Sequence, residues 1–198
     1  MTTPPSARRV DCLEEILTTY HRYGHAHYGE SVSELEHALQ CATFALRAGE
    51  PAVLIAACLL HDYGHLRHGL GEDCADRGID AGHESIGAAA LAPHFQPALV
   101  AGVALHVEAK RYLCFAEPEH LARLSPASSQ SLRLQGGPHD AAAARAFLAH
   151  PHSALALRVR RYDELGKVPG MTTPSLDAFR DVLLAALRPE RDAAVAQS

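Results

Sequence analysis

The chain has 198 residues, of which 47% are hydrophobic, and a formal net charge of -5. This length and apolar content predict a single domain, spanning residues 1–198, with a substantial core. The acidic balance excludes the basic surface that nucleic-acid binding requires. No apolar stretch approaches the ~20 residues of a membrane span, so neither a nucleic acid nor a membrane is an expected partner.

The cysteines and histidines are both informative. Five cysteines are scattered without a CxxC pair, and residues 1–10 lack the apolar segment of a signal peptide. Free thiols and no signal peptide predict a cytoplasmic protein. The 14 histidines are unusually many for a chain of 198 residues, so those at regular spacings are candidate metal ligands.

The first quarter of the chain predicts two helices and a loop. Residues 1–8 are polar and are expected to be disordered. Apolar residues recur at helical spacing over 9–23 and predict an amphipathic helix. A loop rich in His, Tyr and Glu follows over residues 24–31. Two overlapping capping boxes within 31–36 then predict a helix that ends before Gly49.

The next helix is the centre of the predicted fold. Residues 52–60, AVLIAACLL, are apolar on every side, which is typical of a buried helix. His61 and Asp62 follow this helix directly and are therefore expected in the interior, where a buried imidazole and carboxylate need hydrogen-bond or metal partners. A bound metal satisfies both.

The remaining segments also read as helices. A long loop over residues 66–82 precedes a helix that carries His83. Residues 111–115 are expected to leave helical geometry. Further helices are predicted from Pro97, from Ser125-Pro126, over 140–149, after Pro151 and over 176–187. No segment alternates with period two. The fold class is therefore all-α, a single bundle of roughly eight to ten helices, with a frayed tail over 188–198.

Six side chains in this order are candidate metal ligands: His37, His61, Asp62, His83, His106 and Asp163. Taken singly, a buried histidine is more often a satisfied core residue than a ligand. The complete ordered set favours metal binding, because neutral imidazoles with carboxylates suit first-row transition metals. Two carboxylates suit two metals with one carboxylate shared.

This pattern resembles the HD-domain superfamily, and within it the mixed-valent di-iron oxygenases of phosphonate catabolism. The resemblance covers about residues 29–170 and rests on the segments GESVSELEHALQ, LLHDYGH, HVEAKRYLC, LSPASSQSLRLQGGP and RRYDELGKVPG. It implies an HD-domain helical bundle with two iron ions, Fe2+ and Fe3+. One iron would be held by His37, His61, Asp62 and Asp163, and the second by His83, His106 and a bridging Asp62.

The resemblance also implies a phosphonate site formed by His65, Lys110, Ser128, Ser131 and Arg160. The spacing agrees with this, since Lys110 lies one turn after His106, and Arg160 lies three residues before Asp163 on the same helical face. A dianionic head group is bound by cations and by hydroxyls near a helix N-terminus. Taken alone, Lys110 and Arg160 would be interpreted as solvated surface charges.

The loop before the second helix departs from the family pattern. In the family, a Tyr three residues before the Glu of a Gly-Glu pair can occupy an open iron position. Here that Glu is Glu30, His27 stands three residues before it, and Tyr28 follows His27. Either the loop shifts by one residue, or His27 takes the role, or the gate is lost. Glu30 matches the family's partner for the substrate amino group, with a solvated loop charge as the alternative.

The implied activity is oxidative cleavage of a C–P bond by O2. The substrate would be a 1-hydroxy-2-aminoethylphosphonate or an N-methylated relative, supplied by a phosphonate hydroxylase, and the products phosphate and glycine or an N-methylated glycine. Asp62, His65, Glu30, Tyr28 and His27 are the candidate catalytic residues. Because the chain has no Trp for an aromatic cage, the primary amine is preferred. The alternatives are a metal-dependent HD phosphohydrolase acting on a phosphomonoester or nucleotide, and a non-catalytic metal-binding module, against which the complete ligand set argues.

Overall fold

The computed structural model of the chain describes residues 5–189, and for residues 5–9 only the backbone. Ten α-helices and two 3-10 helices, η1 and η2, follow one another along this part of the chain. Their bounds are α1 (Pro5–Tyr23), α2 (Glu34–Arg47), α3 (Ala52–Leu60), η1 (Tyr63–Leu66), α4 (His83–Leu91), α5 (Pro97–Ala116), α6 (Pro118–Arg123), α7 (Pro126–Leu134), α8 (Ala141–Ala149), α9 (Ser153–Leu165), η2 (Leu176–Phe179) and α10 (Arg180–Ala186). Between these bounds the chain makes one isolated antiparallel bridge, Phe95 with Leu187, so the predicted all-α class is confirmed. Of the helices described, none is both long and apolar enough to cross a bilayer.

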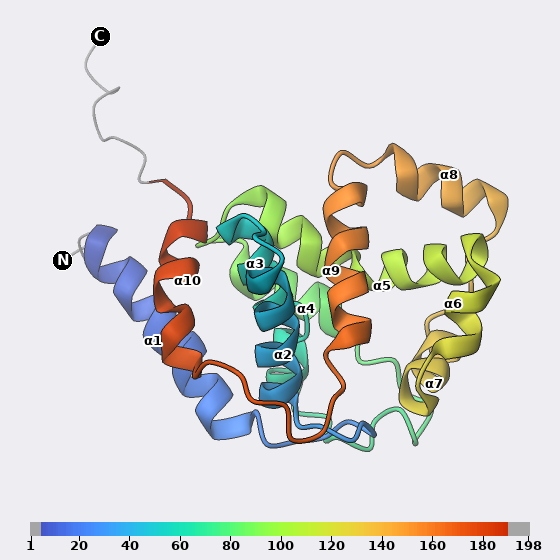
Figure 1. Cartoon of the computed structure of the whole chain (residues 1–198), viewed down its shortest axis with the longest axis horizontal. Helices are drawn as coiled ribbons and strands as arrows, with labels where there is room; N and C mark the ends of the chain where they lie inside the picture. Colours follow the sequence, from blue (N-terminus) through green and yellow to red (C-terminus); the bar gives the residue numbers. More distant parts are fainter. Residues whose placement is uncertain (1–4, 190–198) are drawn as a thin grey trace, which may run out of the picture.

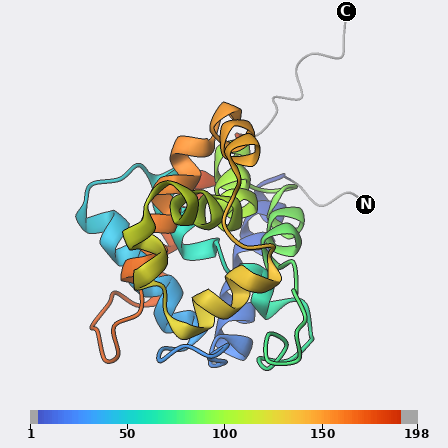
Figure 2. The same ribbon diagram turned by 90° about the vertical axis from the view of Figure 1, so that its right-hand side faces the viewer.

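The buried helix α3 lies inside the bundle as predicted. Every residue from Leu54 to Leu60 is buried. α3 packs on α2, α5 and α10, and α5 packs on α9 and α4. α1 and α10 lie side by side at one end of the molecule, with α6, α7 and α8 at the other (Figure 1). Viewed from that second end, α6 and α7 lie in front of the bundle (Figure 2).

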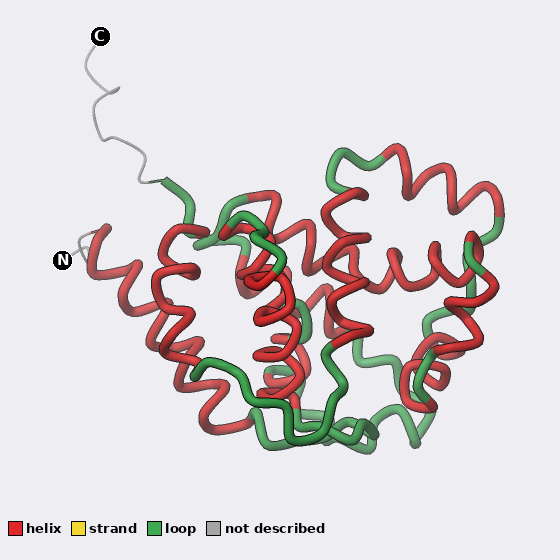
Figure 3. The backbone as a smooth tube through the Cα atoms, in the orientation of Figure 1, coloured by secondary structure: helices red, strands yellow, loops and turns green. Residues whose placement is uncertain are grey.

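Three long connections gather along one edge of the molecule. The segments 24–33, 67–82 and 166–175 run together along the lower edge in Figure 1 and are loops in Figure 3. α2 begins and α9 ends close to this edge. Ligands carried by the first turn of α2 and the last turn of α9 are thereby brought to the same place.

The capping box at Ser33 sets the start of α2. Ser33 Oγ accepts a hydrogen bond from Glu36 N at 3.3 Å, and Glu36 Oε2 accepts one from Ser33 N at 2.8 Å. These reciprocal bonds satisfy two otherwise unpaired amides of the first turn. Of the two overlapping boxes in the sequence, the one at Ser33 is formed, and it puts His37 one turn inside the helix.

Several predicted boundaries were wrong. α1 begins at Pro5, so residues 5–8 are helical rather than disordered, and α5 continues through 111–115 because burial of Leu113 and Cys114 holds that turn in the core. The predicted final helix over 176–187 is divided into η2 and α10. Arg188 was placed in a frayed tail, but its N donates to His94 O and its Nε to Phe95 O, both at 2.8 Å. Residues 1–4 and 190–198 lie outside the described residues.

Gly64 allows η1 to touch the start of α4. A Cβ at Gly64 would lie 1.9 Å from His83 O and 2.9 Å from Gly87 N. We expect Gly64→Ala to lower the free energy of unfolding by about 3 kcal/mol, since a backbone cannot give way as a side chain does. Denaturant unfolding measures this. The control Gly78→Ala has open space and only a left-handed φ of 74° to strain, and should cost about 1 kcal/mol. Equal losses would contradict the close contact.

Candidate active site

The six predicted ligands meet at one place although five separate segments supply them. They are His37 in the first turn of α2, His61 and Asp62 after α3, His83 at the start of α4, His106 within α5, and Asp163 in the last turn of α9. The four imidazoles and Asp163 are buried, and Asp62 is largely buried. Buried polar groups at this density require each other or a bound cation.

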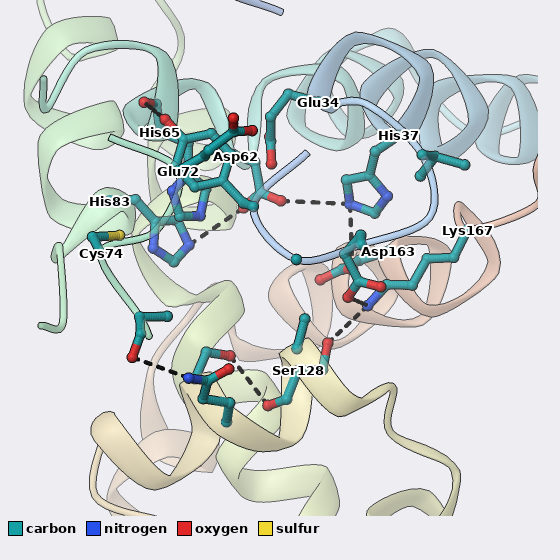
Figure 4. Close-up of a pocket in the computed structure, with 18 of the residues that line it drawn as sticks. Glu34, His37, Asp62, His65, Glu72, Cys74, His83, Ser128, Asp163 and Lys167 are labelled. Carbon is teal, nitrogen blue, oxygen red and sulfur yellow. Dashed lines mark hydrogen bonds and ion pairs between the residues drawn. The ribbon is translucent and has the colours of Figure 1, made fainter. Parts of the chain in front are cut away.

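Asp62 lies in the middle of the cluster. Its Oδ2 is 3.4 Å from His37 Nε2 and 3.1 Å from His61 Nε2. Its Oδ1 is 3.3 Å from Nε2 of both His83 and His106. Figure 4 shows Asp62 between His83 on one side and His37 on the other. The two oxygens of one carboxylate thus face two different groups of ligands, and Asp163 Oδ1 joins the first group at 3.4 Å from His37 Nε2.

The imidazole tautomers are set by the backbone. Three ligands donate from Nδ1 to a carbonyl oxygen: His37 to Gly166 at 2.8 Å, His61 to Cys58 at 2.8 Å and His106 to Val103 at 2.7 Å. His83 turns its Nδ1 toward Glu84 Oε2, 3.5 Å away. Nδ1 of His37, His61 and His106 is thus occupied by the backbone, and Nε2 is the nitrogen that these rings turn toward the cluster, where a neutral imidazole presents a lone pair to a cation.

These lone pairs face one another in two couples. His37 Nε2 is 3.2 Å from His61 Nε2, and His83 Nε2 is 3.0 Å from His106 Nε2. Two lone pairs cannot form a hydrogen bond. They are placed correctly for a shared cation, because two nitrogens about 2.1 Å from one ion at about 90° lie about 3.0 Å apart. The residues present fit two metal ions with Asp62 between them.

The charges agree with this fit. Burial acts to raise the pKa of Asp62, but His61 and the neighbouring imidazoles hold it well below its usual range. Burial acts likewise on Asp163, where Arg160 and His37 keep the pKa low. The cluster thus offers two carboxylates. Cys41 Sγ also lies 3.7 Å from His37 Nε2, but burial raises the pKa of this thiol, which makes Asp163 the better ligand.

A cavity opens beside the ligands, and all six predicted substrate-binding residues line it: Glu30, His65, Lys110, Ser128, Ser131 and Arg160. Lys110 and Arg160 are each only 3% exposed. Lys110 Nζ donates to Ser131 Oγ at 2.8 Å, and Arg160 donates to the carboxylates of Asp163 and Glu164. Two buried basic side chains, one of them bonded to a serine hydroxyl, are suited to binding an anion, and neither is a solvated surface charge.

His65 links this site to the metal cluster. Its ring stacks on that of His83 with centroids 4.0 Å apart. Burial and the neighbouring His83 lower the pKa of His65 well below its usual range, so the imidazole is neutral. A neutral imidazole can give or take one hydrogen bond at the boundary between the metal and anion sites.

The loop places Tyr28, not His27, in the cavity. Tyr28 has a φ of 43°, in the left-handed region, and this turn brings its side chain into the cavity lining. Its hydroxyl donates to His65 O at 2.7 Å, and burial raises the pKa of Tyr28 to about 12. His27 is exposed and lies outside the lining, where its N donates to Glu72 Oε2 at 2.8 Å. The suggestion that His27 takes the tyrosine's role is therefore corrected.

Two lining residues were missed from the sequence. Lys167 Nζ donates to Glu30 Oε1 at 2.8 Å and to Ser128 Oγ at 2.7 Å. It follows Asp163 by four residues, but α9 ends between them, so helical spacing gave no signal. Glu34 is buried at the start of α2, and burial together with Asp62 raises its pKa well above the usual range. Its position three residues before His37 was the available signal.

Comparison with known proteins agrees with this geometry. The HD-domain family matches residues 35–151. A glycine-betaine-forming 1-hydroxy-2-(trimethylamino)ethylphosphonate dioxygenase of Leisingera caerulea is 42% identical over 167 residues, which cover 84% of this chain and 85% of that protein. A hydroxymethylphosphonate dioxygenase of Gimesia maris is 38% identical over 179 residues, covering 86% of this chain and 84% of that protein.

The chain belongs to the HD-domain phosphonate dioxygenases. This confirms the predicted family and makes the chain an oxygenase with a metal site in an HD domain. In this HD-domain dioxygenase the candidate ligand cluster and the buried side chains of Lys110 and Arg160 line one cavity.

Lys110 should give the anion site of this dioxygenase a pH dependence. Burial and the nearby Arg160 lower the pKa of Lys110 from 10.5 to about 7. An anion binds the protonated amine, so the affinity of metal-loaded protein for inorganic phosphate should fall about tenfold per pH unit above about pH 8, where phosphate is already a dianion. Lys110 also affects stability. Between pH 7 and 10.5 its amine is protonated less in the folded protein than in the unfolded chain, so its contribution makes the free energy of unfolding increase as the pH rises through this range.

The matched variant is Lys110→Arg, which keeps its charge throughout this range. Its phosphate affinity, measured by titration calorimetry, should be flat where the wild-type affinity falls. A wild-type profile that is also flat would show that Lys110 does not titrate in the site.

Proposed function

We propose that the chain is a di-iron oxygenase that uses O2 to cleave the C–P bond of a 1-hydroxy-2-aminoethylphosphonate-type substrate, giving phosphate and glycine. An N-methylated substrate would give an N-methylated glycine. The observation that carries this proposal is the shared cavity, with two groups of metal ligands on one wall and buried Lys110 and Arg160 on another. The substrates named for both relatives carry a hydroxyl on the carbon next to phosphorus, which supports the 1-hydroxyphosphonate class.

Iron is the proposed metal because it suits imidazole and carboxylate donors, and because an oxygenase needs a redox-active ion, which zinc is not. His37, His61, Asp62 and Asp163 would hold one ion, and His83, His106 and Asp62 the other. When bound, the Fe2+/Fe3+ pair supplies the redox chemistry that makes O2 reactive toward the substrate. The overall conversion balances without another reductant, because C1 is oxidised to a carboxylate, phosphorus becomes phosphate, and each product gains one oxygen atom.

The chain's own residues bind and orient the substrate. Arg160, Lys110 and the hydroxyls of Ser128 and Ser131 bind the phosphonate oxygens, each charged hydrogen bond contributing about 1.5–3 kcal/mol. His65 completes that site next to the metal. Holding the phosphonate there puts C1 and its hydroxyl at the ligand cluster, which is the positioning that an oxidation at C1 needs. Tyr28 closes the loop side of the cavity until substrate displaces it.

The competing proposal is hydrolysis of a phosphomonoester or nucleotide. Its support is the two-metal ligand set itself, since two bridged cations can also activate water. The two proposals also differ in the enzyme that must act first. The oxygenase is proposed to work in the cytoplasm after a phosphonate hydroxylase, which adds the C1 hydroxyl to its substrate. A hydrolase needs neither O2 nor a hydroxylated carbon.

The test is oxygen uptake by protein loaded anaerobically with iron. On addition of 1-hydroxy-2-aminoethylphosphonate we expect rapid O2 consumption and release of phosphate, and neither from the metal-free protein. Phosphate release from a phosphomonoester under anaerobic conditions, with no O2 uptake on the phosphonate, would favour the hydrolase.

A further inference from the structure

His83 differs from the other three candidate ligand histidines in the partner of its second ring nitrogen. Nδ1 of the other three lies 2.7–2.8 Å from a backbone carbonyl oxygen. For His61 and His106 that oxygen lies three residues earlier, in α3 and in α5. His83 is the first residue of α4, so no helical turn precedes it to supply such a carbonyl. Its Nδ1 faces a side chain instead, the carboxylate of Glu84.

The Glu84 carboxylate has an oxygen in need of a donor. Glu84 Oε2 lies 3.5 Å from His83 Nδ1, and it is buried without a hydrogen bond from any residue that the structure describes. A buried carboxylate oxygen without a donor is costly. An ion bound at Nε2 of a neutral His83 requires the ring proton on Nδ1, which is the nitrogen that faces Glu84.

The orientation of the His83 ring is fixed by its other neighbours. The ring of His65 stacks on it with centroids 4.0 Å apart and 13° between the planes. His83 Nε2 lies 3.3 Å from Asp62 Oδ1, and Figure 4 shows both rings beside Asp62. The backbone of Gly64 packs against the carbonyl of His83. With Nε2 turned to the cluster, Nδ1 is left facing Glu84.

The ligand group that contains His83 is also the poorer of the two. The group with Asp163 offers four donors, two of them carboxylates, whereas the group with His83 offers three and has only the shared carboxylate of Asp62. A carboxylate behind a ligating imidazole raises the basicity of the ring and strengthens its bond to the metal. Glu84 is placed to supply that second negative charge from outside the ligand shell.

We propose that Glu84 is a positioning residue for the metal site of His83 and His106, where it accepts the Nδ1 hydrogen bond of His83 and strengthens binding of the ion. This rests on the proposed two-metal site and goes beyond it, because Glu84 is not among the residues that line the cavity. The alternative is a purely local role, since an acidic side chain in the first turn of α4 also stabilises the start of a helix.

The test is Glu84→Gln, which keeps an acceptor oxygen and removes the charge. In competition with a chelator on anaerobic, iron-loaded protein, one of the two irons should be held about tenfold more weakly or worse, and the other within about twofold of the wild type. Thermal unfolding gives an independent readout. The iron-loaded variant should unfold at a lower temperature than iron-loaded wild type, since less binding energy stabilises it.

Without iron the order should be equal or reversed, because the variant has lost a buried carboxylate that lacked a donor. A role at the start of α4 alone would lower the unfolding temperature with and without iron. This difference in sign separates support of the metal site from support of the helix.

Glu108→Gln is the matched control. Glu108 follows the ligand His106 by two residues, but its oxygens pair with His139 at 2.7 Å and with Arg111 at 2.9 Å. Its loss should leave both irons bound within about twofold. It should lower the unfolding temperature equally with and without iron, which is the pattern of a structural carboxylate.

Both irons held as tightly in Glu84→Gln as in the wild type, or equal drops in its unfolding temperature with and without iron, would overturn the role of Glu84 and leave the di-iron site intact. A single iron per wild-type chain would refute the two-metal site and this role together. Selective loss of one iron in Glu84→Gln, without oxygen uptake by the wild type, would support Glu84 and refute the oxygenase.

Discussion

Replacing Asp62 with Asn should reduce the protein to at most one tightly bound metal per chain and lower turnover by at least about 10³-fold. The two oxygens of Asp62 face different couples of imidazoles, at 3.1–3.4 Å from their Nε2 atoms. An asparagine has the same shape but offers one uncharged oxygen and an NH2 group that cannot bind a cation. Metal content by elemental analysis and the rate of O2 uptake measure the two effects.

The control for this variant is Asp76→Asn. Asp76 lines the same cavity, where its Oδ1 accepts a hydrogen bond from Gln130 Nε2 at 3.0 Å. It loses the same charge, yet we expect it to keep both metals. If Asp62→Asn also retained two metals and full turnover, the two couples of imidazoles would not be joined through this carboxylate.

Removing the Arg160 guanidinium should have the second largest effect. Arg160→Met is expected to lower kcat/KM on the phosphonate by about 30- to 5,000-fold, because a buried cation at an anion site contributes about 2–5 kcal/mol. The same change leaves Glu164 without its buried partner and should lower the free energy of unfolding by about 3–5 kcal/mol in the metal-loaded protein. Steady-state kinetics and denaturant unfolding separate the two losses.

Two further variants make this prediction specific. Arg161→Met removes the next arginine, which is 54% exposed and pairs with Glu117 away from the cavity, and should change either quantity little. The double variant Arg160→Met with Glu164→Gln removes the unpaired charge, so it should recover stability without recovering kcat/KM. Recovery of both would mean that Arg160 only stabilises the fold.

Much of the fold and the metal cluster could be predicted from the sequence, because strong local signals carry them. The apolar run over 52–60 could only be a buried helix, and its end fixed where His61 and Asp62 lie. The capping box at Ser33 placed His37 in the first turn of α2. When the sequence clearly marks where a helix begins or ends, the position of a ligand at that end can be predicted as well.

The rest depended on contacts that sequence spacing does not encode. Tyr28 enters the cavity through a left-handed backbone conformation, which is rare for a residue with a Cβ, so the neighbouring His27 was an equal candidate. Lys167 lies beyond the end of α9, where helical periodicity stops. The continuation of α5 through 111–115 is set by tertiary packing of Leu113 rather than by local propensity.

The ratio of O2 consumed to phosphate released tests the proposed chemistry most directly. It should be measured on protein loaded anaerobically with two iron ions per chain and supplied with 1-hydroxy-2-aminoethylphosphonate. Oxidative cleavage at a bridged iron pair predicts one phosphate for each O2 and no phosphate when O2 is absent. Phosphate released at the same rate without O2 would contradict it and identify water as the attacking molecule.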